Sequence, residues 1–77
     1  MRVAYVQVVE GGRSETLGPQ PRADAELDWE WALSELPREG KRLTRLEMHR
    51  VGDTLRRAEF MGPRGLIEVL LVDDGSW

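Results

Sequence analysis

The residues of this chain that could act as a nucleophile or a base are few and well separated. His49 is the only histidine, and there is no cysteine. Histidine is the side chain best suited to exchange protons near neutral pH, and Ser14, Ser34 and Ser76 could in principle supply a hydroxyl nucleophile. However, none of these serines lies in the strand-to-helix turn that exposes a catalytic serine. We therefore expect His49 to be a surface histidine, and we expect the chain not to be an enzyme.

Carboxylates could bind a hard cation through oxygen, and the best candidates are Asp73 and Asp74, with Asp53 as a third ligand. Their spacing does not match a calcium-binding loop. A single histidine without cysteine also excludes the common zinc ligand sets. The glycines at 11–12 and 62–65 lack the spacing of a phosphate-binding loop. The sequence thus predicts no metal site, no cofactor site and no catalytic site.

Arginines are concentrated in the second half of the chain, where they could contact nucleic acid. The net charge is nevertheless −3, which argues against a general nucleic-acid binder. Sheets that bind nucleic acid usually carry stacking aromatic residues, and none is expected here beside the arginines. We therefore expect no binding to nucleic acid and keep it only as an alternative. The arginines concerned are Arg42, Arg45, Arg50, Arg56, Arg57 and Arg64.

The acidic first half contains the most informative residues, Trp29 and Trp31. Residues 1–40 carry eight acidic and four basic side chains, whereas residues 41–77 carry six and seven. On a helix, residues two apart point about 200° from each other, so Trp29 would face the core and Trp31 the solvent. Tryptophan is enriched at binding hot spots. If the segment is instead a strand, both indoles belong to the core; alternatively, Trp31 packs on residues 11–23.

These features favour a non-enzymatic protein-interaction module, such as an adaptor, an inhibitor or a small subunit. The partner would be another protein with a basic surface, and self-association is a further expectation for so small a domain. An alternative is an acidic mimic of nucleic acid that occupies a basic groove on another protein. The residues expected to bind the partner are Leu27, Asp28, Glu30, Trp31 and Glu35.

The segment 24–36, which must present these residues, can be interpreted in two ways. At 3.6 residues per turn, one apolar stripe runs along it (Ala25, Trp29, Ala32, Leu33 and Leu36). Asp24 could cap the start of such a helix, and Pro37 would stop it. At a period of two, apolar residues also alternate with polar ones, as in a half-buried strand. Strong helix formers dominate the segment, so we favour the helix.

The rest of the chain predicts strands. Residues 2–9 are β-branched and aromatic, and they indicate a strand, whereas residues 11–23 indicate a polar loop. Residues 42–50, 54–61 and 66–73 indicate a three-stranded meander joined by tight turns. The expected pairs across the first turn are Arg50–Thr54, Glu47–Arg57, Arg45–Glu59, Leu46–Ala58 and Thr44–Phe60, and those across the second are Phe60–Ile67 and Ala58–Val69. The expected inner face is Leu46, Met48, Ala58, Phe60, Ile67, Val69 and Leu71.

The predicted fold is α+β, a four-stranded antiparallel sheet formed by the first strand and the meander, with one helix packed on one face. A small all-β five-stranded barrel is the alternative if 24–36 is a strand. We expect a single domain over residues 1–77, with a frayed tail at 74–77 that includes Trp77. No apolar segment is long enough to span a membrane, and a cytoplasmic location is expected.

Overall fold

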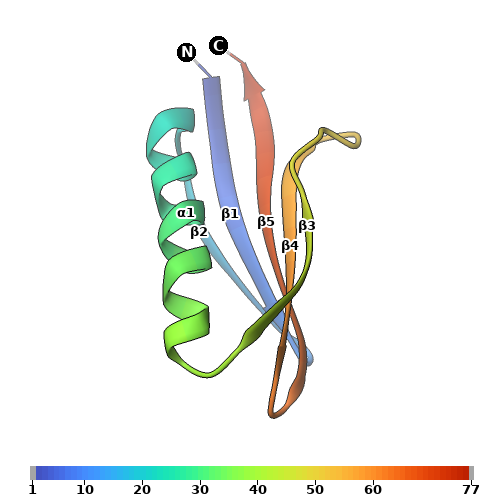
Figure 1. Cartoon of the computed structure of the whole chain (residues 1–77). Helices are drawn as coiled ribbons and strands as arrows, with labels where there is room; N and C mark the ends of the chain where they lie inside the picture. The colour runs from blue at the N-terminus through green and yellow to red at the C-terminus, as the bar shows by residue number, and fades with distance from the viewer. Residues whose placement is uncertain (1, 77) are drawn as a thin grey trace.

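The computed structural model describes residues 2–76, which form one helix and five strands (Figure 1). Their bounds are β1 Arg2–Glu10, β2 Arg13–Pro21, α1 Arg22–Arg38, β3 Arg42–Glu47, β4 Thr54–Gly62 and β5 Gly65–Ser76. The α+β class is thus confirmed, with one more strand than expected.

All five strands belong to one antiparallel sheet in the order β2-β1-β5-β4-β3. The helix therefore leads from one edge strand, β2, to the opposite edge strand, β3. Figure 1 shows α1 lying along one side of the sheet, with the segment after it crossing to β3. The sheet is open, so the barrel alternative is wrong.

The predicted loop 11–23 is wrong, because most of it forms the edge strand β2. The residues Gly11-Gly12 make a two-residue connection, and Glu10 pairs with Arg13 directly after it. Such short Gly-rich connections are typical of hairpins. Every residue of β2 except Gln20 is exposed, so this strand has no apolar alternation by which its sequence would indicate a strand. Proline and glycine, which suggested a loop, are tolerated at a sheet edge.

The helix over 24–36 is confirmed and extends to Arg22 and Arg38, so the strand interpretation is wrong. The apolar stripe of the helix faces the sheet as predicted. Ala25, Trp29 and Ala32 are buried, and Leu33 and Leu36 are partly buried and pack against the core. Asp24 does not cap the helix; it lies in the first turn, and among residues 2–76 no side chain forms a capping hydrogen bond at the start of the helix.

The helix ends one residue after Pro37 in a hydrogen-bonded turn. The Lys41 N–H donates to the carbonyl of Leu36 (3.1 Å), and the Gly40 N–H donates to the carbonyl of Pro37 (3.1 Å). This is the Schellman arrangement, in which a glycine takes a left-handed conformation, and Gly40 has φ +86°. The turn directs the chain from α1 towards β3.

The predicted register of the meander is confirmed over most of its length. Arg45 pairs with Glu59, Leu46 with Ala58 and Glu47 with Arg57, and the two expected pairs of β4 with β5 also form. Two pairs are wrong. An irregularity between Leu43 and Arg45 places Leu43, not Thr44, opposite Phe60, and Thr54 bridges to Val51 instead of Arg50.

The core lies between α1 and the inner face of the sheet. Its largest fully buried side chains are Phe60, Ile67, Leu71, Val6 and Val69. The inner face is therefore correct for β4 and β5, but it is wrong for Leu46 on β3 and for Met48 directly after β3, both of which are exposed. The reason is the position of the helix, which packs over β1, β2 and β5 and touches β3 only slightly.

At the C-terminal end, β5 continues past residue 73 and pairs with β1 as far as Ser76. Trp77 lies outside the described residues. Within residues 2–76, the helix is too short and too polar to cross a lipid bilayer.

Candidate interaction surfaces

The outward face of α1 presents two large apolar side chains to solvent. Leu27 is 63% exposed and Trp31 is 64% exposed, and residues four apart are neighbours on a helix surface. The helix thus places an indole and an isobutyl group side by side, as the helical interpretation of 24–36 predicts. We call the five predicted partner-binding residues the α1 outward surface: Leu27, Asp28, Glu30, Trp31 and Glu35.

Trp29 determines how the helix is rotated on the sheet, and therefore which residues face outwards. Its side chain is buried at 2% exposure, and the indole N–H donates to the Val69 carbonyl on β5 at 3.5 Å. The Arg56 guanidinium lies 5.5 Å from the ring centroid, within reach of a cation–π interaction. Arg56 also forms an ion pair with Glu26 on the helix (3.3 Å). These contacts hold Trp29 inwards, so Trp31 must point away from the sheet.

The acidic side chains of α1 are divided between the fold and the solvent. Glu26 contacts Arg22 and Arg56, at 3.2 and 3.3 Å, and Asp28 accepts a hydrogen bond from Gln20 of β2 at 2.8 Å. Asp28 is thus the member of the α1 outward surface that is half-buried and already hydrogen-bonded to β2. Glu30 and Glu35 make no ion pair within the part of the chain that the structure describes, and neither does Asp24.

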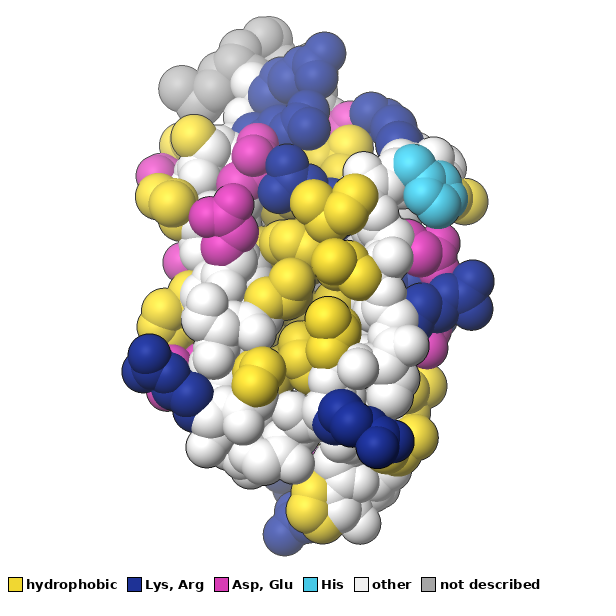
Figure 2. Space-filling view, viewed as in Figure 1, with side chains coloured by type: hydrophobic (Ala, Val, Ile, Leu, Met, Phe, Trp, Pro, Cys, Tyr) yellow, Lys and Arg dark blue, Asp and Glu magenta, His cyan; other side chains and the backbone are white. Residues whose placement is uncertain are grey.

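A second apolar area, which the sequence reasoning missed, lies along β3 and the residue that follows it. Leu43 is 44% exposed, Leu46 is 47% exposed and Met48 is 56% exposed. Figure 2 shows apolar side chains gathered in a band between the helix and the hairpin that carries His49. We call Leu43, Leu46 and Met48 the β3 margin. The alternation along β3 did indicate an apolar face, but it could not show that α1 stops short of it.

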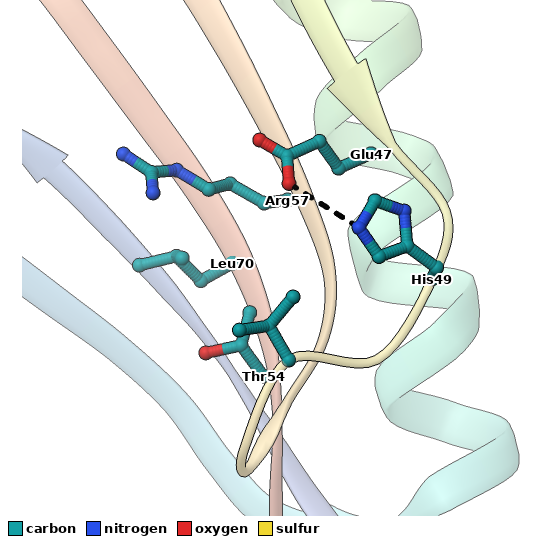
Figure 3. Close-up of a pocket in the computed structure, with 6 residues that line it drawn as sticks. Glu47, His49, Thr54, Arg57 and Leu70 are labelled. Atoms are coloured by element: carbon teal, nitrogen blue, oxygen red, sulfur yellow. Dashed lines mark ion pairs between the residues drawn. The ribbon is translucent and has the colours of Figure 1, made fainter.

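His49 borders a small hollow on the outer side of the hairpin, drawn in Figure 3. Its volume is about 120 Å³, and it is lined by Glu47, His49, Val51, Thr54, Arg57 and Leu70. Ligand pockets typically measure roughly 300–1,000 Å³, so this hollow is too small for most substrates. The His49 Nε2 lies 3.7 Å from Glu47 Oε2, while Arg57 is bound by Glu59 and Glu68. Within the part of the chain that the structure describes, the residues that line the hollow include charged side chains and no serine.

Arg50 connects the tip of the same hairpin to β5. Its Nε donates to the Gly52 carbonyl (2.7 Å), and its guanidinium lies 3.1 Å from Asp73. The backbone N–H of Gly75 donates to Asp73 at 3.0 Å, and this bond and the charge of Arg50 hold the pKa of Asp73 below its ordinary value of 3.8. Asp73, considered above as a cation ligand, is thus part of an ion pair.

Most of the arginines considered for nucleic-acid binding are neutralised by neighbouring carboxylates. Arg45 pairs with Glu47 along its own strand at 2.9 Å, Arg57 with Glu68 at 2.7 Å, and Arg56 with Glu26. The register places Arg45 opposite Glu59, but Arg45 pairs with Glu47 along its own strand, while Arg57 pairs with Glu59 along β4 and with Glu68 across to β5. Pairing of this kind weakens the positive potential that would attract a phosphate backbone.

Among residues 2–76, no three histidine or carboxylate side chains gather in a way that could hold a metal ion. Comparisons of the chain with protein-family models, with curated proteins and with solved structures found no match.

Proposed function

We propose that this protein is a non-enzymatic interaction module that binds another protein through the α1 outward surface. Trp31 and Leu27 would enter an apolar pocket of the partner, and a basic rim around that pocket would face Glu30 and Glu35. The observation that carries the proposal is the exposure of an indole and a neighbouring leucine, each nearly two-thirds accessible, on an element whose other face completes the core.

Exposure of these two side chains has no structural reason within the domain. Trp29, not Trp31, supplies the indole of the core. A fully buried tryptophan or leucine contributes on the order of 1.5–3 kcal/mol relative to an exposed one, so binding could recover this free energy. Tryptophan also offers a large contact area while few torsion angles must be fixed. The position therefore suits a binding anchor.

The carboxylates around the two apolar side chains indicate the chemistry of the partner. Asp24 and Glu30 are exposed and Glu35 is half-buried, and none of the three forms an ion pair within residues 2–76. Rim charges of this kind steer association and select the partner more than they add affinity. A basic rim is complementary to them, and an acidic surface would be repelled.

The test is site-specific photocrosslinking. A photoreactive residue in place of Ser34, which is exposed and one turn from Trp31, should capture one protein from a lysate of the source organism. The same probe at Thr16, which is exposed on β2, is the matched control. The captured protein is then purified, and its affinity is measured against ionic strength. Salt should weaken binding, because exposed charge pairs are screened. Equal capture from both positions, or an affinity that salt leaves unchanged, would count against the proposal.

A further inference from the structure

The two edges of the sheet differ in how well they are protected against pairing with another strand. β2 contains Gly18, Pro19 and Pro21, and proline lacks the N–H that a further strand would need. Helix α1 also packs against β2, where Gln20 bonds Asp28. β3 has neither proline nor glycine, pairs only with β4, and receives little cover from the helix. Natural proteins usually protect such an edge; β3 has only its charged side chains and the irregularity between Leu43 and Arg45 for this purpose, so its backbone edge is the more open of the two.

The side chains along β3 add an apolar face to this open backbone edge. Leu46 lies opposite the buried Ala58, so it points to the same side of the sheet as the core. It is nevertheless about half exposed, as are the other members of the β3 margin. An edge with free backbone groups and an adjoining apolar strip is suited to strand addition.

We infer that the β3 edge pairs with the β3 edge of a second copy of this chain, antiparallel and centred on Leu46. The two copies would then share one continuous sheet across a two-fold axis, which is the commonest symmetry of homo-oligomers. Because antiparallel pairing about this axis keeps the inner faces on one side, both helices lie on the same face. The β3 margins of the two copies meet between them.

The charges of β3 select this register. Its regular part is Arg45-Leu46-Glu47, since the strand is irregular between Leu43 and Arg45. The two-fold axis can pass through any one of these three residues if the inner faces of the two copies are to lie on the same side of the sheet. Centring on Arg45 opposes two arginines, and centring on Glu47 opposes two glutamates; like charges directly opposite each other destabilise a sheet. Centring on Leu46 places each Arg45 opposite the other copy's Glu47, and joins the two Leu46 side chains.

The α1 outward surface does not take part in this pairing, because it points away from the sheet on which β3 lies. The inference is thus independent of the proposed function. A short ladder buries little area, and interfaces below about 1,200 Å² are typical of weak complexes, so we expect dissociation constants on the order of 10–100 μM.

Sedimentation velocity over protein concentrations from about 5 to 500 μM spans that range and tests the inference. The weight-average mass of the native chain should rise from 8.8 kDa towards twice that value. Arg45→Glu and Glu47→Arg should each weaken the dimer by about tenfold or more, because each creates opposed like charges. The double variant R45E/E47R should restore dimerisation, because the charges are again opposite. Circular dichroism checks that each variant is folded, and Trp31→Ala should dimerise like the native chain.

Hydrogen exchange gives a second measurement that does not depend on variants. Backbone amides of β3 should become more protected as the concentration rises, while those of β2 should not change. A native chain that remains at 8.8 kDa throughout, or single charge variants that dimerise as well as the native chain, would overturn the inference. Dimerisation with protection confined to β2 or α1 would overturn it as well, since another surface would then be responsible.

Discussion

Trp29 and Trp31 are two positions apart, but Trp29 is part of the core and Trp31 is exposed to solvent. Trp29→Ala would remove a buried indole, and truncation of a buried aromatic residue costs about 3–5 kcal/mol. Trp31→Ala would alter an exposed position and should change the free energy of unfolding by less than about 0.5 kcal/mol. Urea denaturation of both variants and the native chain measures this contrast. Similar losses in the two variants would show that Trp31 packs within the fold.

The lowered pKa of Asp73 should make the stability of the fold depend on pH. Its pKa is lowered in the folded protein, first by the Gly75 N–H and also by Arg50. A carboxyl group with a lowered folded pKa stabilises the fold above its unfolded pKa, and this contribution is lost as the pH falls through the folded pKa. The melting temperature of Asp73→Asn should therefore lie below that of the native chain at neutral pH, and the two should converge as the pH falls below 3.8.

Thermal melts from neutral pH down to about pH 2 follow this convergence, because the range covers both protonation states. Asp74→Asn removes the same charge one residue away, where no bond to Arg50 forms among the described contacts, and serves as the control. A difference between the native chain and Asp73→Asn that stays constant to the lowest pH would contradict the assignment.

At the scale of the elements, Gly18 allows β2 to lie against β1. It has φ +118°, and a Cβ there would lie 3.1 Å from the Ala4 carbonyl oxygen and 3.2 Å from the Tyr5 Cβ. The register of the two strands shifts at the same place, between Ala4 and Val6. Gly18→Ala should therefore destabilise the domain by about 1–3 kcal/mol, the usual cost of a strained backbone.

Gly12→Ala is the matched control, because Gly12 has open space around it and an ordinary backbone conformation. It should change stability by less than about 0.5 kcal/mol. The midpoints of chemical denaturation compare the two, and equal midpoints would show that β2 tolerates a side chain at residue 18.

The elements that could be predicted from the sequence are those with an apolar period. The stripe through Ala25, Trp29 and Ala32 predicted α1, and opposite charges with matched apolar faces predicted the pairing of β3 with β4. β2 could not be predicted in this way, because an edge strand exposed on both faces needs no apolar residue. Its best indication was the pair Gly11-Gly12 directly after a strong strand.

The two candidate interaction surfaces also differ in how far the sequence predicts them. The outward position of Trp31 follows from helix geometry once Trp29 is assigned to the core, so the sequence was sufficient. The exposure of Leu46 and Met48 was not predictable, because it depends on where α1 lies across the sheet. Local patterns specify which side of a strand is apolar, but they do not specify which part of that side a neighbouring element covers.

For the whole molecule, the two apolar surfaces suit two different partners. The β3 margin adjoins an open backbone edge and suits a second copy, whereas the α1 outward surface is rimmed by carboxylates and suits a basic partner. Small domains often gain stability by association. A dimer paired through β3 would carry two α1 outward surfaces on one face, and it could bind two partners or two sites of one partner.

Whether Trp31 anchors a partner protein is decided by the affinity of the partner, once it has been identified by crosslinking and purified, for two variants. Trp31→Ala is compared with Met61→Ala, which shortens a side chain that is 44% exposed and lies on β4. Isothermal titration should show a loss of about 2 kcal/mol or more for Trp31→Ala, the size expected for a hot spot, and no significant change for Met61→Ala. Unchanged affinity of Trp31→Ala, or an equal loss in both variants, would show that Trp31 is not the anchor.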